Sequence, residues 1–266
     1  MSFQTHEQNG LVWLTADTLT GVSHGFSTRQ GGVSQGPWAS LNLRVDHEDD
    51  PAAVSENYRR FCAILGADSA RSVLSRQVHE TTVRIVTTED CGKGLLRERD
   101  YSADALITNE RQLPLFVFSA DCGLLLLHDP IHHAVGAIHA GWRGCAAGIV
   151  EKTVTEMGRV YGSRPADLQA AIGPCIGQCC FETDSDVPED MLAGLGEDAK
   201  PYLEPRGSKW HVDLAGLNRQ WLLRAGVLPE HIDTCDLCTA CHPELFWSHR
   251  KMGNMRGLQT AAILLP

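Results

Sequence analysis

Residues 113–144 read LPLFVFSADCGLLLLHDPIHHAVGAIHAGWRG. Three apolar runs in this stretch have the length and density of buried strands: Leu113 to Phe118, Gly123 to His128 and Ala134 to Ile138. Cys122 falls in the tight connection between the first two runs, and His139 stands at the end of the third. The stretch therefore predicts three successive core strands, with a thiol and an imidazole placed where strands end.

The residues after His139 predict a glycine turn followed by a helix. Apolar side chains recur there at helical spacing, and they are Ala146, Ile149, Val150, Val154, Met157 and Val160. Gly158 and Gly162 are the expected stops of this helix. A strand, a glycine turn and a helix N-terminus in succession favour an anion, because unpaired backbone N–H groups point outward there. Arg143 adds a bidentate donor suited to phosphate or carboxylate.

Two more helices are predicted from their capping residues. Asp50-Pro51 opens a helix that runs to about Leu65, with apolar residues on one face. Asp213 is the expected N-cap of a helix over 214–225, which Gly226 closes.

Further strands are expected over 103–107 and 168–172. Residues 182–207 are richer in acid, Pro and Gly, and we expect a mobile insertion there. At 266 residues with 43% apolar content, the chain is long enough to bury a large core.

Composition excludes two classes of partner. The net charge is −10 and no block of Lys and Arg occurs, which argues against nucleic acid. The longest apolar runs are strand-sized, which argues against a membrane span. Residues 1–10 are polar and do not resemble a signal peptide, so we expect a cytoplasmic protein. Its ten cysteines should then be mostly reduced.

Three separated residues offer the ligands of a catalytic metal. They are His79 in Gln77-Val78-His79, Cys122 in Ala120-Asp121-Cys122, and His139 before the glycine turn. Two His and one Cys are a known ligand set for a zinc ion that keeps a fourth position open for water or substrate. Each residue taken alone is more often structural, and no local motif joins the three.

Two other cysteine groups compete with this interpretation. Cys235-x-x-Cys238-x-x-Cys241-His242 resembles an iron–sulfur run or a structural zinc knuckle, but a second cysteine pair at proper spacing is missing. Pro174-Cys175 to Cys179-Cys180 comes close to a zinc-deaminase motif, but no His-x-Glu precedes it. The simplest interpretation is a set of packed free thiols.

Motifs spread along the chain resemble those of one known family. In chain order they are His24-Gly-Phe-Ser-Thr-Arg, Gly31-Gly32-Val33-Ser34, Leu41-Asn42-Leu43, Gln77-Val78-His79, Ala103-Asp104-Ala105, Ala120-Asp121-Cys122, Asp129-Pro130, His139-Ala-Gly-Trp-Arg-Gly, Ile172-Gly173-Pro174-Cys175 and Cys238-Thr239. Together they resemble the YfiH family, also called the laccase-domain or polyphenol oxidase family. The resemblance implies an α+β fold of mixed β-sheets flanked by helices, similar to bacterial Cys–His deamidating toxins. It also implies that residues 1–266 form a single catalytic domain.

The resemblance implies an activity and its residues. The family's better-supported activity is zinc-dependent purine nucleoside phosphorolysis of adenosine, inosine, guanosine and methylthioadenosine, together with adenosine deamination. Its catalytic metal ligands fall on His79, Cys122 and His139, with zinc as the expected ion and copper as the alternative. The partners implied are a purine nucleoside and phosphate, and we expect a monomer or a weak homo-oligomer.

Four residues match segments around the family's pocket and are the candidate substrate contacts. They are Ser27, Arg29, Asn42 and Arg143. The glycine-containing loop over 22–36 has the composition of a loop whose backbone can approach a ligand, although an ordinary surface loop is the simpler interpretation. Two departures leave substrate preference open, because Gly123-Leu124 replaces the usual Leu-Pro and His249 replaces a usual Tyr.

Four alternatives to the phosphorylase stay open. A copper polyphenol oxidase needs many imidazoles, usually in His-x-His pairs, and none of the twelve histidines is arranged that way. A metal-free hydrolase would use Cys122 as nucleophile and His139 as base. One branch of the family is linked to editing of cell-wall precursors. A zinc-stabilised interaction module would have no turnover at all.

Overall fold

The three apolar runs form strands in the computed structural model, which describes residues 3–45 and 47–266. They become β7 (Leu115–Ser119), β8 (Gly123–Asp129) and β9 (Ala134–Ala140), so the strand predictions are confirmed. The chain does not keep the three in one sheet. The chain crosses from one sheet to another at the turn that carries Cys122, because β7 belongs to a first sheet and β8 and β9 belong to a second.

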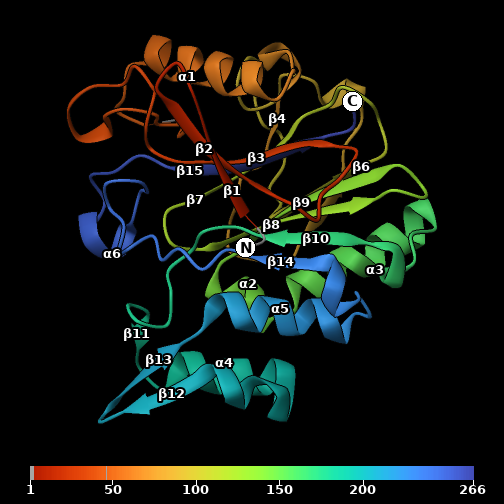
Figure 1. Cartoon of the computed structure of the whole chain (residues 1–266), viewed down its shortest axis with the longest axis vertical. Helices are drawn as coiled ribbons and strands as arrows, with labels where there is room; N and C mark the ends of the chain where they lie inside the picture. Colours follow the sequence, from red (N-terminus) through yellow and green to blue (C-terminus); the bar gives the residue numbers. More distant parts are fainter. Residues whose placement is uncertain (1–2, 46) are drawn as a thin grey trace.

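Two six-stranded mixed sheets form the centre of the fold (Figure 1). The first has the order β1-β2-β3-β15-β7-β4 and adds β1 (Phe3–Gln8), β2 (Leu11–Ala16), β3 (Ser23–Ser27), β4 (Val73–Leu74) and β15 (Gln259–Leu264). The second has the order β14-β10-β8-β9-β6-β5 and adds β5 (Val83–Ile85), β6 (Ala105–Thr108), β10 (Gln169–Ile172) and β14 (Ile232–Thr234). The predicted strands over 103–107 and 168–172 are therefore confirmed as β6 and β10.

The sheets pack against each other, and this explains why β7, β8 and β9 are buried at every position. Leu124 and Leu126 of β8 point into the core between the sheets, whereas Leu125 and Leu127 point into the core under the helices. Successive side chains of a strand alternate between its faces, so a strand buried on both faces loses the usual alternation of polar and apolar residues.

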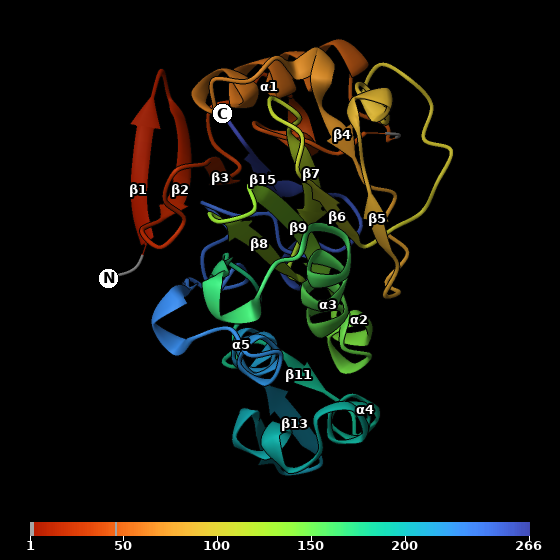
Figure 2. The ribbon, with the colours of Figure 1, turned by 90° about the vertical axis from the view of Figure 1, so that its right-hand side faces the viewer.

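Helices cover the outer face of each sheet (Figure 2). Helix α1 (Pro51–Ile64) lies on the first sheet, and the Asp50 side chain caps it by accepting the N–H of Ala52. Helices α3 (Ile149–Tyr161) and α5 (Leu214–Arg224) lie on the second sheet. Asp213 caps α5 by accepting the N–H of Gly216, so both capping predictions are confirmed.

The segment that we expected to form one helix after the glycine turn forms two helices. Helix α2 (Trp142–Ala146) ends before Gly148, which has a left-handed φ of 76° and starts α3. Gly158 lies inside α3 and does not end it, so that prediction is wrong. Gly162 ends it with a φ of 78°, as expected. Because α2 has only five residues, the predicted anion site at its N-terminus gains no support from a helix dipole.

The segment over 182–207 is folded, which corrects the prediction of a mobile insertion. It contains β11 (Glu182–Thr183), α4 (Asp186–Leu195) and β12 (Leu203–Arg206), and it pairs with β13 (Lys209–Val212) in a small third sheet. Its apolar side chains join the core of the second sheet, and they include Val187, Met191, Leu195 and Ala199.

The remaining elements are short. The α-helix α6 covers His249–Met252. The 3₁₀ turns cover Gly36–Trp38, Ser69–Arg71, Thr88–Asp90, Pro165–Asp167, Gly196–Tyr202 and Pro229–His231. Among the described residues, no helix combines the length and the apolar character needed to cross a membrane.

Candidate metal centre

The structure brings His79, Cys122 and His139 together. His79 lies in the connection after β4, Cys122 lies in the turn between β7 and β8, and His139 is the last residue but one of β9. One ligand atom from each of the three lies within 4.8 Å of the other two. The two imidazole rings are 4.9 Å apart and nearly perpendicular, at 87°. This is the convergence that the sequence could only suggest.

Asp104 holds the His139 side chain and the backbone that carries His79. Its carboxylate accepts His139 Nδ1 at 2.8 Å and the backbone N–H groups of Val78, His79 and Glu80 at 3.0–3.1 Å. The His139 ring is thereby held with Nε2 free to face Cys122. A carboxylate behind a ligating histidine is the usual partner of a protein metal site, because it fixes the ring and makes the free nitrogen a better donor.

The charges of the three groups favour a cation among them. Burial opposes ionisation of Cys122, but hydrogen bonds from His139 and His79 outweigh it and lower its pKa to about 6. Burial likewise opposes protonation of His139, but Asp104 and Cys122 raise its pKa to about 9. Without a metal ion, the protonated His139 imidazole donates a hydrogen bond to the Cys122 thiolate. A metal ion would take the place of that proton and accept both donors.

The space between the three donors fits a metal ion. A Cβ added to Gly141 would lie 2.9 Å from His79 Cδ2, 3.2 Å from Cys122 Sγ and 3.4 Å from a carbon of the His139 ring. Only a glycine leaves this volume open. Two imidazoles and one thiolate form a three-ligand set that zinc accepts with a fourth position left for substrate.

Two cavities meet at this centre, and His79, Ala120 and Cys122 line both of them. The first has a volume of 340 Å³ and four arginines on its walls, namely Arg44, Arg76, Arg99 and Arg256. The second has a volume of 370 Å³ and is lined by Trp142, Phe181, Ile176 and Leu214, together with Arg143, His249 and Arg250. The first cavity is therefore the more basic, and the second has the aromatic side chains of Trp142 and Phe181 on its wall.

Of the four predicted substrate contacts, only Arg143 lines one of these cavities. It is exposed and its guanidinium stacks on Trp142 at 4.1 Å from the ring centroid. Asn42 is fully buried, where it donates to Asp49 and accepts the N–H groups of Arg44 and Leu258. The structure thus gives Asn42 a role in holding a loop. Whether it also touches substrate stays a prediction.

Ser27 and Arg29 also have structural partners. The Ser27 hydroxyl is buried and accepts the N–H of Thr260 on the neighbouring strand. The Arg29 guanidinium donates to Pro243 and Ala39 carbonyls and lies 4.0 Å over the Trp247 ring. Their role in substrate binding likewise stays a prediction.

The prediction of a loop over 22–36 is wrong for Ser23–Ser27, which form strand β3, and in the rest of that segment Gly31 and Gly32 approach the backbone of the chain itself. A Cβ on Gly31 would lie 2.2 Å from the Leu11 Cα, and one on Gly32 would lie 2.1 Å from the Ser40 carbonyl. The composition of this loop therefore serves packing of backbone on backbone.

The structure also explains Gly123, because a Cβ there would lie 2.9 Å from the Asn218 amide nitrogen.

The sequence did not reveal the arginines of the first cavity or the role of Asp104. The acid was present in the quoted motif Ala103-Asp104-Ala105, where a carboxylate at the start of a buried strand could have signalled a partner for an imidazole. Arg44 and Arg256 had no such signal, because they come from distant loops. Both are half-buried, and burial lowers the pKa of each guanidinium.

Comparison with known proteins decides the family. A family model described as multi-copper polyphenol oxidoreductase laccase matches residues 23–266. The chain belongs to this laccase-domain family. Among the solved structures that resemble this family member is the hypothetical protein YfiH of Bacillus licheniformis, with a TM-score of 0.92 and 32% identity over 98% of this chain and 99% of that one.

Curated relatives of this laccase-domain chain carry another name. The purine nucleoside phosphorylase YlmD of Geobacillus stearothermophilus is 35% identical over 97% of this chain and 96% of its own length. Its crystal structure matches with a TM-score of 0.87 and covers 99% of this chain and 98% of that one. The purine nucleoside phosphorylase of Deinococcus radiodurans is 39% identical over 97% of this chain and 94% of its own length.

Proposed function

We propose that this laccase-domain protein is a zinc-dependent purine nucleoside phosphorylase. The observation that carries the proposal is the position of His79, Cys122 and His139 between a basic cavity and an aromatic cavity. Phosphorolysis needs an anion and a nucleoside to meet at one point, and these two cavities meet at the three donors. The names of the curated relatives support the same activity.

His79, Cys122 and His139 would hold the zinc ion, and Asp104 would orient His139. Bound zinc supplies Lewis-acid polarisation of a substrate oxygen. The ligand set favours zinc over a multi-copper centre, because the described residues bring only two imidazoles into this group and none into the other metal-capable group.

The basic cavity would bind phosphate. The buried Nε of Arg256 has no hydrogen-bond partner among the described residues, so it can donate to an anion in the cavity without losing a protein contact. Arg44 and Arg256 together would set two guanidinium groups against the phosphate oxygens. In the reaction, a phosphate oxygen bonds to ribose C1′ while the bond from C1′ to the purine N9 breaks. The purine keeps that electron pair and takes up a proton.

The aromatic cavity would bind the purine. Trp142 and Phe181 offer flat faces for stacking, and Arg143 lies against Trp142 where it can reach an oxygen or nitrogen of the base. The substrates proposed are adenosine, inosine, guanosine and methylthioadenosine. A secondary adenosine deaminase activity is part of the proposal, in which water adds at C6 and ammonia leaves.

The test is a product assay on purified protein loaded with zinc. Each nucleoside is incubated with and without phosphate, and free base and ribose 1-phosphate are measured. We expect base release that depends on phosphate, with loss of activity in Cys122→Ala and His79→Ala. Cys91→Ser is the matched control, because this half-buried thiol lines neither of the two cavities. A zinc-loaded protein that cleaves none of the four nucleosides would contradict the proposal.

One rival has a structural basis. Cys122, His139 and Asp104 form a chain of nucleophile, base and orienting acid, which a metal-free hydrolase would also use. Chelation separates the two. Activity that survives complete zinc removal and is lost on alkylation of Cys122 would favour the hydrolase, whereas loss on chelation and recovery on zinc addition would favour the phosphorylase.

A further inference from the structure

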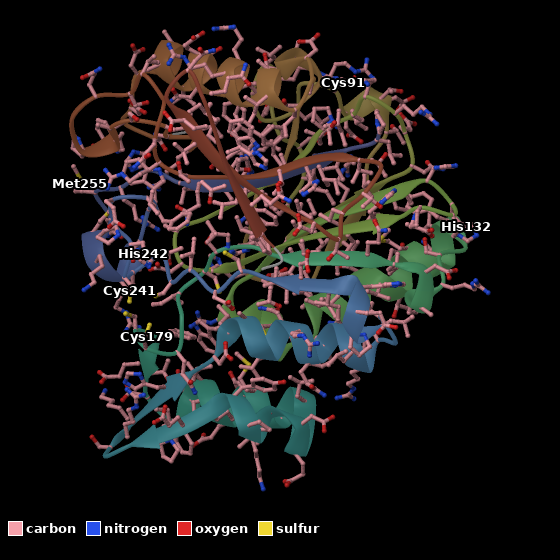
Figure 3. The ribbon with its side chains drawn as sticks, viewed as in Figure 1. Cys91, His132, Cys179, Cys241, His242 and Met255 are labelled. Atoms are coloured by element: carbon pink, nitrogen blue, oxygen red, sulfur yellow. The ribbon has the colours of Figure 1, made fainter. Side chains whose placement is uncertain are left out.

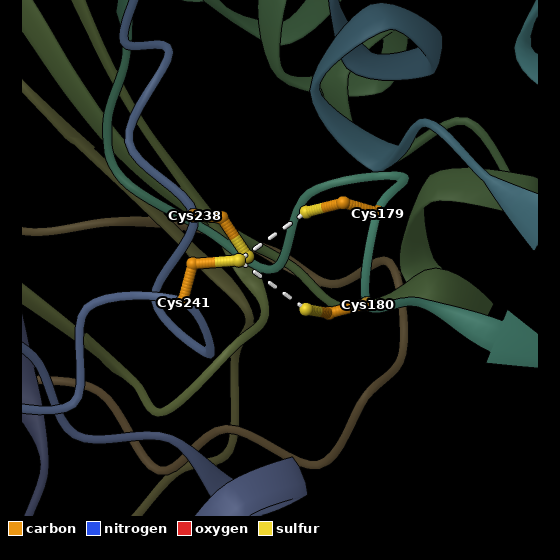
Figure 4. A group of neighbouring side chains, drawn as sticks. All are labelled: Cys179, Cys180, Cys238 and Cys241. Carbon is orange, nitrogen blue, oxygen red and sulfur yellow. Dashed lines mark hydrogen bonds between the residues drawn. The ribbon is translucent and has the colours of Figure 1, made fainter.

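Four cysteines from two distant segments lie close together, and Cys179 and Cys241 of this group lie on one side of the molecule (Figure 3). Cys179 and Cys180 come from the turn before β11, and Cys238 and Cys241 come from the loop after β14. The sequence treats these as two incomplete groups, one of which lacks a second cysteine pair. In the structure each group supplies the pair that the other lacks (Figure 4).

The distances suit a shared ion. All four sulfurs lie within 4.8 Å of one another. Cys241 Sγ lies 3.5 Å from Cys179 Sγ and 3.4 Å from Cys180 Sγ. A disulfide would need about 2.05 Å. Four sulfurs at about 2.3 Å from one tetrahedral zinc ion lie about 3.8 Å apart, so the sulfurs are already near the spacing that an ion imposes.

The backbone is arranged to stabilise thiolate at Cys238. The N–H of Gly177 donates to Cys238 Sγ at 3.2 Å. The N–H of Cys241 donates to the Cys238 carbonyl at 3.2 Å, which closes a tight turn over Cys-x-x-Cys. The N–H of Gly177 requires the sulfur to act as an acceptor, and a thiolate is the better acceptor and the metal ligand.

The two segments are fixed to each other by the backbone. The N–H of Thr239 donates to the Cys175 carbonyl at 3.0 Å. The Arg250 guanidinium donates to the Cys180 and Glu182 carbonyls, both at 2.9 Å. The four sulfurs are thus held on a rigid frame. Cys179 and Cys241 are exposed, which gives an ion access from solvent.

We propose that Cys179, Cys180, Cys238 and Cys241 form a second metal site, a closed tetrathiolate site for zinc. Four cysteine ligands leave no open position, so the site is structural and does no chemistry on substrate. On binding, each thiol gives its proton to solvent and four Zn–S bonds form, with no electron transferred. The site does not depend on the proposed function of the first centre.

The second site would hold one wall of the substrate cavity. Thr239, inside the Cys-x-x-Cys turn, donates its hydroxyl to Asp121 at 2.6 Å. Asp121 also accepts the N–H of Arg250 at 2.7 Å and directly precedes Cys122. Phe181, next to Cys180, lines the aromatic cavity. Loss of the ion should therefore loosen the turn that carries Cys122.

The test uses Cys122→Ala as the background, so that metal at the first centre does not contribute. We expect this protein, purified with zinc and a reductant, to retain one zinc ion per chain. After exchange for cobalt it should show the strong near-ultraviolet absorption of thiolate bound to cobalt. Adding Cys241→Ser or Cys179→Ser should remove the ion and the absorption, whereas adding Cys91→Ser should leave both. Both cluster substitutions are at exposed positions, so the fold should survive them.

Three results would overturn the proposal. If the purified Cys122→Ala protein retained no zinc, the four cysteines would be shown not to bind the ion. Iron and a visible iron–sulfur spectrum would overturn the zinc assignment. Reduced protein that binds no added zinc but forms a disulfide between two of the four cysteines in air would show a redox-active pair instead. Because every measurement is made without the first centre, failure of the phosphorylase proposal would not change these outcomes.

Discussion

Gly141 is the residue whose size the first centre constrains most directly. Its φ of −63° suits any residue, so Gly141→Ala adds a methyl group without backbone strain. That methyl would lie 2.9 Å from the His79 ring and 3.2 Å from the Cys122 sulfur. Because overpacking of this kind costs about 1–3 kcal/mol, the ligands should move apart. We expect at least tenfold lower phosphorolysis and weaker zinc retention, measured by product assay and metal analysis.

Gly136→Ala is the matched control for this substitution. Gly136 lies on the same strand as His139, and a Cβ there would make only ordinary contacts of 3.4–3.6 Å. Wild-type zinc content in Gly141→Ala would argue that the space beside the three donors is not an ion site.

Asp104 supports the centre without being one of its ligands. Asp104→Asn keeps an oxygen for His139 or for the N–H groups of Val78 to Glu80, but removes the charge that makes His139 a strong donor. We expect zinc affinity to fall about tenfold to hundredfold, as is typical when the partner of a ligating histidine is changed. Competition with a chelator measures the affinity, and circular dichroism checks the fold. Unchanged affinity would show that Asp104 only holds the loop.

The chemistry of the donors made three residues of this site predictable, and its neighbours were not. Cys122 in a turn between two strands and His139 near the end of a third follow from the apolar pattern, whereas His79 lies in the connection between β4 and β5. Arg44 and Arg256 are ordinary surface cations until the loops that carry them face one cavity. Ser27 and Asn42 match a family motif, but the structure shows them holding strands and loops through buried hydrogen bonds.

At the scale of elements, local signals located helix ends well and helix interruptions poorly. Asp50 and Asp213 cap their helices through side-chain bonds that a sequence pattern can anticipate. The break at Gly148 depends on a tertiary contact, because the Trp221 ring of α5 leaves only 3.1 Å for a Cβ there. Such packing is invisible to periodicity. Local composition also misled over 182–207, where pairing with β13 folds a segment rich in acid and Gly.

His24 links β2 and β3 and makes the first sheet sensitive to acid. Its ring accepts the N–H of Ala16 at 2.9 Å, and burial lowers its pKa to about 4 from 6.5, with His128 and His6 contributing repulsion. Between these values the unfolded chain binds a proton that the folded chain does not. The stability that the neutral ring gives is therefore complete above pH 6.5 and is lost as the pH falls toward 4.

Replacing His24 tests whether this contribution to stability is lost as the pH falls. We expect His24→Gln to be less stable than wild type at pH 8, because burial and packing change. At pH 5 this difference in the free energy of unfolding should be about 2 kcal/mol smaller, because at that pH keeping the His24 ring neutral costs free energy only in the wild type. Urea unfolding at both pH values measures it. A difference that grows toward low pH would contradict the assignment.

The whole molecule brings together residues that no segment joins. The first centre draws its donors from a loop after β4, a turn between the two sheets and the end of β9. The cysteine cluster joins a turn before β11 to a loop after β14. The pairing of β8 with β9 places Cys122 beside His139, and the pairing of β10 with β14 places the two cysteine segments side by side. Such pairings are long-range in sequence, so the chain's patterns predicted the strands but not their neighbours.

The placement of one cavity on each side of the centre predicts that two arginines affect two different substrates. Arg256 lines the basic cavity and Arg143 lines the aromatic one. A charge-assisted hydrogen bond contributes about 1.5–3 kcal/mol. Arg256→Met should therefore raise the KM for phosphate on the order of tenfold to hundredfold and leave the KM for inosine near that of wild type. Arg143→Met should raise the KM for inosine and spare that for phosphate.

Steady-state kinetics with each substrate varied in turn separates these effects, and zinc content shows that the centre is intact. The two variants are controls for each other, because both remove one guanidinium and keep a long apolar side chain. If Arg143→Met raised the KM for phosphate and Arg256→Met did not, phosphate would enter from the aromatic side, and the assignment of the two cavities would have to be reversed. If neither KM changed, phosphate binding would have to be assigned to other residues.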